Sequence, residues 1–185
     1  HTARLVEALA ASGRRAEVLS WSRVVPRLLF PGRSPWLEDG APSAGGPVPV
    51  VGEVLLDVLD PRTWCRARER LAASRAPVVV QWWHPVAAPA LLVATAGIEP
   101  GRLRVVCHNA LPHEAFPAAA AAARRVLGRA GVVLCHSHAE ASRVASLLGG
   151  RSGPRVEVAP LPCLLPADLL DAMPGQAECG KGEGG

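Results

Sequence analysis

Three apolar runs of this sequence end at a histidine, the side chain whose protonation changes nearest neutral pH. The runs are PVVVQWW before His84, RVVC before His108 and GVVLC before His136. Short β-branched runs that stop at polar groups are typical of buried parallel strands. If the three runs form neighbouring parallel strands, the three histidines lie on one rim of the sheet, which is where open α/β folds bind ligands.

The second run leads into a dense group of polar side chains, VVCHNALPHE over residues 105–114. Asn109, His113 and Glu114 follow His108 in this stretch and could hydrogen-bond the hydroxyl groups of a ligand or position a base. The other interpretation is that they are loop residues that cap the next helix. Both interpretations place them just beyond the carboxyl end of a strand.

The elements that must position these residues alternate along the chain. We expect helices over 2–12, 61–74, 85–96 and 117–129 and a last helix after residue 137, with strands over 16–21, 54–58, 77–83, 103–108, 131–136 and 155–159. Asp60 followed by Pro61 is typical of a helix start. Ser137 and Glu140 predict a capping box, in which each side chain satisfies a backbone donor of the other residue. The alternation predicts an α/β fold: a Rossmann-like open parallel sheet with helices on both faces and right-handed crossovers.

The length and composition fit one domain. With 185 residues and 49% hydrophobic content the chain can bury a core, and 19% charged residues is too few for a disordered chain. We assign residues 1–163 to the Rossmann-like domain and residues 164–185 to a Gly-rich mobile tail. The sequence starts within an amphipathic helix, whereas an α/β protein normally has a strand first, so we expect this domain to lack its first strand.

Residues 76–98 contain no Asp, Glu, Lys or Arg and are long enough to span a bilayer. Gln81, His84, Pro85 and Pro89 interrupt this stretch. A strand, a turn and a helix that starts at Pro85 account for the interruptions better than a membrane span does.

The sequence predicts neither a metal nor a cofactor. Five cysteines, an odd number without a C-x-x-C pair, favour reduced thiols in a cytoplasmic protein over a disulfide framework or a zinc ribbon. A zinc site from His108, Cys135, His136 and His138 is conceivable, but residues adjacent in a strand face opposite ways and cannot all converge. There is also no Walker A or G-x-G-x-x-G motif to hold a nucleotide.

Several segments in order resemble a known family: HTARLVEALAASG, EVLSWSR, PRLLFPG, QWWHP, VCHNALPHE and VVLCHS. They resemble the amino-terminal half of bacterial family 4 glycosyltransferases, retaining enzymes of the GT-B fold, over residues 1–163. In that family this half binds the acceptor and a second Rossmann-like domain binds the nucleotide-sugar donor. The resemblance implies the acceptor half of an enzyme that transfers a sugar, with retention, to a glycan or lipid-linked acceptor. The donor domain is missing from the sequence, so we expect the chain alone to be inactive.

The resemblance also implies a role for His108, and the residues after it are candidates on their chemistry. His108 resembles the strand-end histidine that contacts the donor sugar near the reaction centre, and we take His108 and Glu114 as the candidate catalytic residues. Asn109 and His113 are candidates for contacts to acceptor hydroxyls. The structural alternative for His108 is a histidine satisfied by the backbone at a strand end.

Two tryptophans next to His84 are further candidates for substrate binding. Trp82, Trp83 and His84 could form a stacking wall for a sugar ring. Because a tryptophan pair in a strand usually packs at least one ring in the core, we expect one of the two to be buried.

The segment WSRVVPRLLFPGRSPW over residues 21–36 mixes arginines with large apolar side chains and contains no acid. Its Arg23, Arg27, Leu29, Phe30 and Arg33 suit docking on an anionic membrane surface or on an acceptor with a lipid tail. The alternative is a long loop over the sheet edge with solvated arginines. We expect no nucleic-acid partner, because no basic stripe with exposed aromatics runs along any predicted helix.

Two other classes of function stay open. One is a stand-alone, non-catalytic Rossmann-like binding module, and the other is a peripheral membrane scaffold that uses the 21–36 segment.

Overall fold

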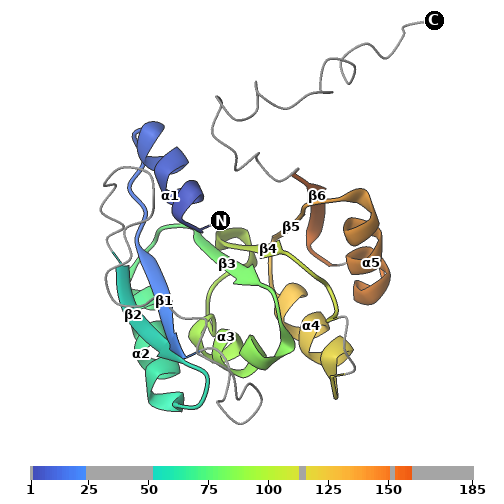
Figure 1. The fold of residues 1–185 in the computed structure, drawn as a ribbon, viewed down its shortest axis with the longest axis horizontal. Helices are drawn as coiled ribbons and strands as arrows, with labels where there is room; N and C mark the ends of the chain where they lie inside the picture. The colour runs from blue at the N-terminus through green and yellow to red at the C-terminus, as the bar shows by residue number, and fades with distance from the viewer. Residues whose placement is uncertain (1, 24–51, 113–115, 151–152, 160–185) are drawn as a thin grey trace, which may run out of the picture.

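The computed structural model describes residues 2–23, 52–112, 116–150 and 153–159, and strands and helices alternate along them (Figure 1). The elements are α1 (Thr2–Ala11), β1 (Val18–Arg23), β2 (Gly52–Asp57), α2 (Pro61–Ala73), β3 (Val78–Trp82), η1 (Pro85–Ala87), α3 (Ala88–Ala94), η2 (Pro100–Arg102), β4 (Leu103–Cys107), α4 (Ala119–Leu127), β5 (Val132–Cys135), α5 (His138–Leu148) and β6 (Arg155–Val158). The predicted α/β class is confirmed.

The strands form two parallel sheets. One contains β3, β4, β5 and β6 in that order, and the other contains β1 and β2. The three histidine-terminated runs are therefore neighbouring parallel strands, as the sequence predicts, and the larger sheet is a Rossmann-like open sheet. The division of the strands into two sheets was not foreseen.

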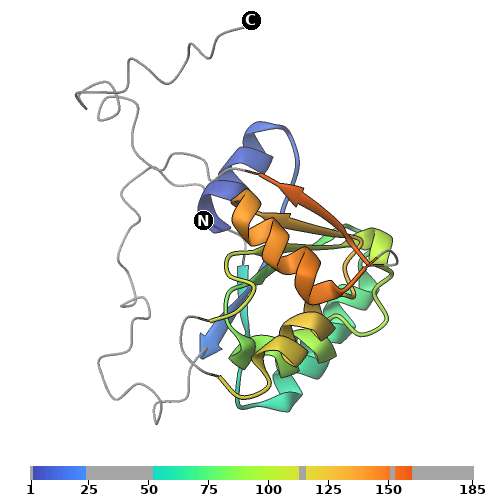
Figure 2. The same ribbon diagram turned by 90° about the vertical axis from the view of Figure 1, so that its right-hand side faces the viewer.

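One face of the larger sheet carries the core. Alternate residues of its strands are buried against the helices: Val78, Val80, Trp82, Leu103, Val105, Cys107, Val133 and Cys135. On the other face Val79 is 44% exposed and Arg104 is also exposed. Figures 1 and 2 place α1 on one side of the strands and α2, α3 and α4 on the opposite side. Helices thus lie on both sides, but most of the packing is on one.

Local signals set most of the helix boundaries. The Asp60 side chain accepts a hydrogen bond from the backbone N–H of Arg62 at the start of α2, and Ser137 does the same for Glu140 at the start of α5. The capping box is formed only on the serine side, because the Glu140 carboxylate is directed to the backbone N–H of Ala110 instead. A tertiary contact has replaced the local one.

Two predicted helices differ from the structure. The helix expected over 85–96 begins as η1 and continues as the short helix α3, with His84 as the N-terminal cap. The helix expected from residue 117 begins at Ala119, because Ala118 has a left-handed backbone with φ of 57°. The first predicted strand is displaced by two residues toward the carboxyl end, to Val18–Arg23.

Residues 76–98 form β3, η1 and α3, so they are a strand, a turn and a helix as expected. Within the described parts of the chain, no helix has the length and apolar character needed to cross a bilayer. The predicted tail, 164–185, lies outside the described residues.

Candidate functional site at the carboxyl rim of the sheet

Three side chains form a row where β3, β4 and β5 end. Trp82, Cys107 and Cys135 are partners in register, so the next residues, Trp83, His108 and His136, lie side by side. The backbone N–H of His108 still donates to the carbonyl of Trp82, at 2.9 Å, which continues the ladder one residue beyond the strands. Because side chains alternate along a strand, His108 and His136 face the side opposite the core, whereas Trp83, beyond the end of β3, still packs partly against the main core cluster.

His108 is held between a neutral amide and a second histidine. Its Nε2 lies 2.7 Å from Oε1 of Gln81, which places the ring N–H on Nε2 as the donor to that oxygen. Its ring centroid is 5.1 Å from that of His136, at an interplanar angle of 47°. Burial lowers the pKa of His108, and the neighbouring His136 lowers it further. The lowered pKa keeps the His108 ring neutral at physiological pH, which suits it to hydrogen bonding as an uncharged imidazole.

His136 is fixed from β6. Its Nδ1 lies 3.1 Å from the carbonyl oxygen of Ala159, so the N–H of this ring is on Nδ1 and donates to that oxygen. Ala159 is itself joined to the end of β5, because its N–H donates to the carbonyl of Cys135 at 2.8 Å. Backbone groups thus set the ring orientation on which the His108 contact depends.

His84 has a structural role at the same rim. Its Nδ1 accepts a hydrogen bond from the backbone N–H of Val86 at 3.1 Å and so caps η1. Its ring lies edge-on to Phe116, with centroids 5.1 Å apart, and tilted against Trp83 at 5.8 Å. The imidazole, Phe116 and the half-buried Trp83 make a continuous aromatic surface.

The tryptophan pair divides as predicted. Trp82 is fully buried, at 0% exposure, within the main core cluster, whereas Trp83 is partly exposed and packs against the edge of that cluster. Trp82 therefore does not contribute a surface to a ligand in this conformation, and only Trp83 remains a candidate for the stacking wall. The indole Nε1 of Trp82 is buried without a hydrogen-bond partner among the described residues.

Of the three candidate residues that follow His108, only Asn109 is described. It is exposed, while the next residue, Ala110, is almost fully buried with its N–H bonded to Glu140. Glu140 therefore anchors the segment that follows His108. The sequence did not predict this role, because the spacing of Ser137 and Glu140 also fits a capping box. His113 and Glu114 lie outside the described residues.

The predicted membrane-docking segment is described only at its first arginine. Arg23 forms an ion pair with Asp57 across β1 and β2, at 3.4 Å. Arg27, Leu29, Phe30 and Arg33 lie outside the described residues.

Two cysteines next to the rim face the core. The thiols of Cys107 and Cys135 are buried partners on adjacent strands, and burial raises the pKa of each above the usual value for a thiol. Neither is therefore a ready nucleophile. Cys135 faces the core while His136 faces away from it, as strand alternation predicts. Over the described ranges, no three His, Cys, Asp or Glu side chains are grouped so that they could hold a metal ion.

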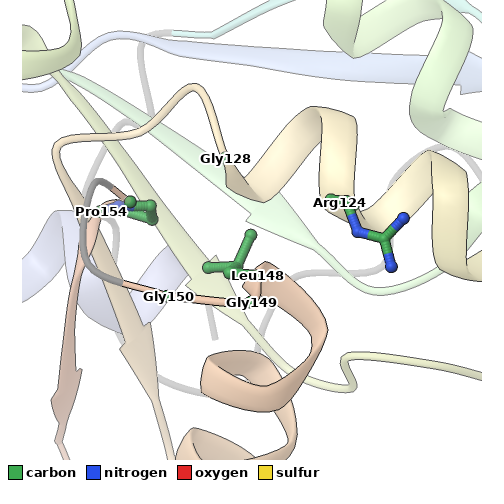
Figure 3. A pocket seen from close by; sticks show the side chains of 7 residues that line it. Arg124, Gly128, Leu148, Gly149, Gly150 and Pro154 are labelled. Carbon is green, nitrogen blue, oxygen red and sulfur yellow. The ribbon is translucent and has the colours of Figure 1, made fainter.

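A hollow of about 350 Å³ lies elsewhere on the molecule, at the carboxyl ends of α4 and α5. Figure 3 shows Leu148 projecting into the space between Gly128 and the Gly149–Gly150 turn. Arg124, the charged residue among the described ones that line the hollow, is turned to the carbonyl of Leu147, to which its Nε donates at 3.0 Å. The hollow is open and glycine-lined, and it shares no residue with the rim.

Comparison of the chain with protein-family models, with curated proteins and with solved structures gives no match in any of the three. The geometry of the molecule itself establishes the fold as α/β with a parallel sheet.

Proposed function

We propose that this chain is the acceptor-binding domain of a retaining glycosyltransferase, and that its rim is where acceptor and donor sugar meet. The observation that carries the proposal is the row of Trp83, His108 and His136 at the carboxyl ends of three neighbouring parallel strands. Ligands of open α/β sheets bind outside this end of the strands. The ordered sequence segments that resemble family 4 glycosyltransferases support the same assignment.

The chemistry of the rim suits a sugar ligand. Sugar transfer passes through an oxocarbenium-like state, so the acceptor side needs groups that orient hydroxyls while the diphosphate charge is met elsewhere. The His108 ring is oriented by Gln81, and the His136 ring is oriented by the backbone carbonyl of Ala159. The partly exposed ring of Trp83 beside them offers an apolar face on which a sugar ring can stack.

The proposal requires a partner domain for turnover. Catalysis needs the donor diphosphate held against the acceptor in a closed cleft, and a single Rossmann-like domain supplies one wall of such a cleft. We expect the chain alone to give no product with nucleotide-sugars and glycan or lipid-linked acceptors. The complete enzyme would work on such acceptors at the cytoplasmic face of the membrane.

The test uses the complete enzyme with a panel of nucleotide-sugars. His108→Ala should lower kcat by roughly 100-fold, which is typical for loss of one oriented donor to a transition state, while the thermal unfolding transition stays in place. Glu114→Gln should act mainly on the KM for the acceptor. His138→Ala is the matched control, because His138 is exposed at the start of α5.

Three outcomes contradict the proposal. Full activity of His108→Ala would remove this rim as the reaction site. Loss of activity that follows a lost unfolding transition would make His108 a structural residue. Turnover by the isolated chain would refute the two-domain interpretation.

A further inference from the structure

We propose that Gln81 is a positioning residue: it holds the ring proton of His108 on Nε2, so that Nδ1 meets a ligand as a hydrogen-bond acceptor. The group recognised at this point of the rim is then a donor, such as a sugar hydroxyl, and not an oxygen of a diphosphate or a carboxylate. The state of the ring follows from this chain alone, whereas the identity of the ligand group rests on the function proposed above.

The strand geometry brings the Gln81 side chain to His108. Gln81 lies opposite Val106 in the register of β3 and β4, and both residues face the side away from the main core. His108 is two residues beyond Val106, so it faces the same side. Oε1 of Gln81 reaches along the strands to within 2.7 Å of Nε2 of His108. The contact therefore depends on a long side chain at this position of β3.

The contact determines which ring nitrogen of His108 carries the proton. A neutral imidazole has one ring proton, so one nitrogen donates and the other accepts. The amide oxygen of Gln81 can only accept, which places the proton on Nε2 and the lone pair on Nδ1. His136 carries its ring proton on Nδ1 instead, where it donates to the carbonyl oxygen of Ala159. The two neighbouring rings of the rim are therefore opposite tautomers, each fixed by a different acceptor.

Gln81 also differs from an acidic residue in bringing no charge to the ring. A carboxylate in its place would favour the imidazolium, in which both ring nitrogens donate. Burial and the neighbouring His136 lower the pKa of His108, which favours the neutral ring as well. A neutral ring with its proton on Nε2 can only accept at Nδ1, and the oxygens of a diphosphate or a carboxylate at neutral pH are acceptors themselves. The ligand group that suits His108 is thus a hydroxyl.

The first test is the tautomer of each ring in this chain, read by NMR at mildly alkaline pH from the two- and three-bond proton–nitrogen correlations of the histidine side chains. His108 should carry its proton on Nε2. His84 and His136 supply both reference patterns in the same spectrum, because Nδ1 of His84 accepts from Val86 and Nδ1 of His136 donates to Ala159.

Two variants separate the acceptor from the charge. Gln81→Met removes the acceptor and nearly keeps the length of the side chain, so His108 should populate both tautomers. Gln81→Glu keeps an acceptor and adds a charge, so the proton should stay on Nε2 while the pKa of His108 rises by about one unit or more. Val79→Met is the matched control, because Val79 lies on the same face of β3, two residues earlier, and is 44% exposed. This control should leave the ring signals unchanged.

The second test uses the complete enzyme. Gln81→Met should lower kcat about 10-fold, the size expected for one lost hydrogen bond between neutral groups, without moving the thermal unfolding transition. The KM for the acceptor should stay the same, and Val79→Met should keep the native rate. His108→Ala removes the whole ring, whereas Gln81→Met leaves the ring in place and changes only which nitrogen carries the proton.

A ring proton on Nδ1 of His108 in the unaltered chain would overturn the proposal, and so would an unchanged tautomer in Gln81→Met. If Gln81→Met does not fold, the unaltered chain and Gln81→Glu decide. An unchanged kcat for Gln81→Met in an enzyme that His108→Ala inactivates would also overturn the proposal, because the ring would then act without Gln81. Full activity of both variants would refute the proposed function and the ligand group assigned here, while the spectra would still decide the state of the ring.

Discussion

The anchoring of the rim by Glu140 gives a stability prediction with a definite size. Glu140 is 9% exposed, and its carboxylate accepts a hydrogen bond from the N–H of Ala110, a residue that is 1% exposed. Replacing Glu140 by Ala leaves that N–H buried without its acceptor, at a cost of about 1–3 kcal/mol. The carboxylate also lies in the first turn of α5, where a negative charge contributes about 0.3–1 kcal/mol. The ion pair with Arg143 adds little, since the arginine side chain is 70% exposed.

We therefore expect Glu140→Ala to lower the free energy of unfolding by about 1–4 kcal/mol. Urea denaturation monitored by circular dichroism measures this quantity, and the midpoint should fall without a change in slope. Glu140→Gln keeps an oxygen acceptor but loses the charge, so it should cost about half as much. Arg143→Ala is the matched control, with an expected cost below about 0.5 kcal/mol. If Glu140→Ala costs no more than Arg143→Ala, the buried bond to Ala110 does not stabilise the fold and the anchoring argument is wrong.

Three further predictions address other parts of the fold. Gly131→Ala should destabilise by about 1–3 kcal/mol in thermal melts, because a Cβ there would clash with the backbone carbonyl oxygen of Pro100. Gly101→Ala is the matched control and should be near neutral, because nothing lies within 4 Å of its Cβ. Burial lowers the pKa of His108 below its ordinary 6.5, so the unfolded chain binds the proton more readily than the folded one. The free energy of unfolding should therefore be highest above pH 6.5 and should decline as the pH falls below it. His108→Gln should remove this part of the pH dependence, and an unchanged dependence of the free energy of unfolding on pH would contradict the prediction. Ala118→Gly should stabilise by about 1 kcal/mol, since φ of 57° strains any residue with a Cβ, and a loss of stability would show that the strain is absent.

Local patterns in the sequence determined most of the elements. Strand and helix periodicity gave the alternation, and short-range caps such as Asp60 and Ser137 act within three residues, so they are readable without the fold. The placement of His108 and His136 on one rim also followed from sequence, because parallel strands have their carboxyl ends at the same edge. The exchange of a capping contact for a tertiary one at Glu140 did not follow, since its partner is 30 residues away.

Tertiary structure decided which side chains become neighbours. Strand alternation predicts that one tryptophan of the pair is buried, but only the packing of the helices on one face makes it Trp82. The bond between His108 and Gln81 depends on the register between β3 and β4, which side-chain pattern alone leaves undetermined. The separation of β1 and β2 from the larger sheet could not be predicted from the sequence either. Strand pairing joins distant segments, and the residues of a strand do not encode which strand lies beside it.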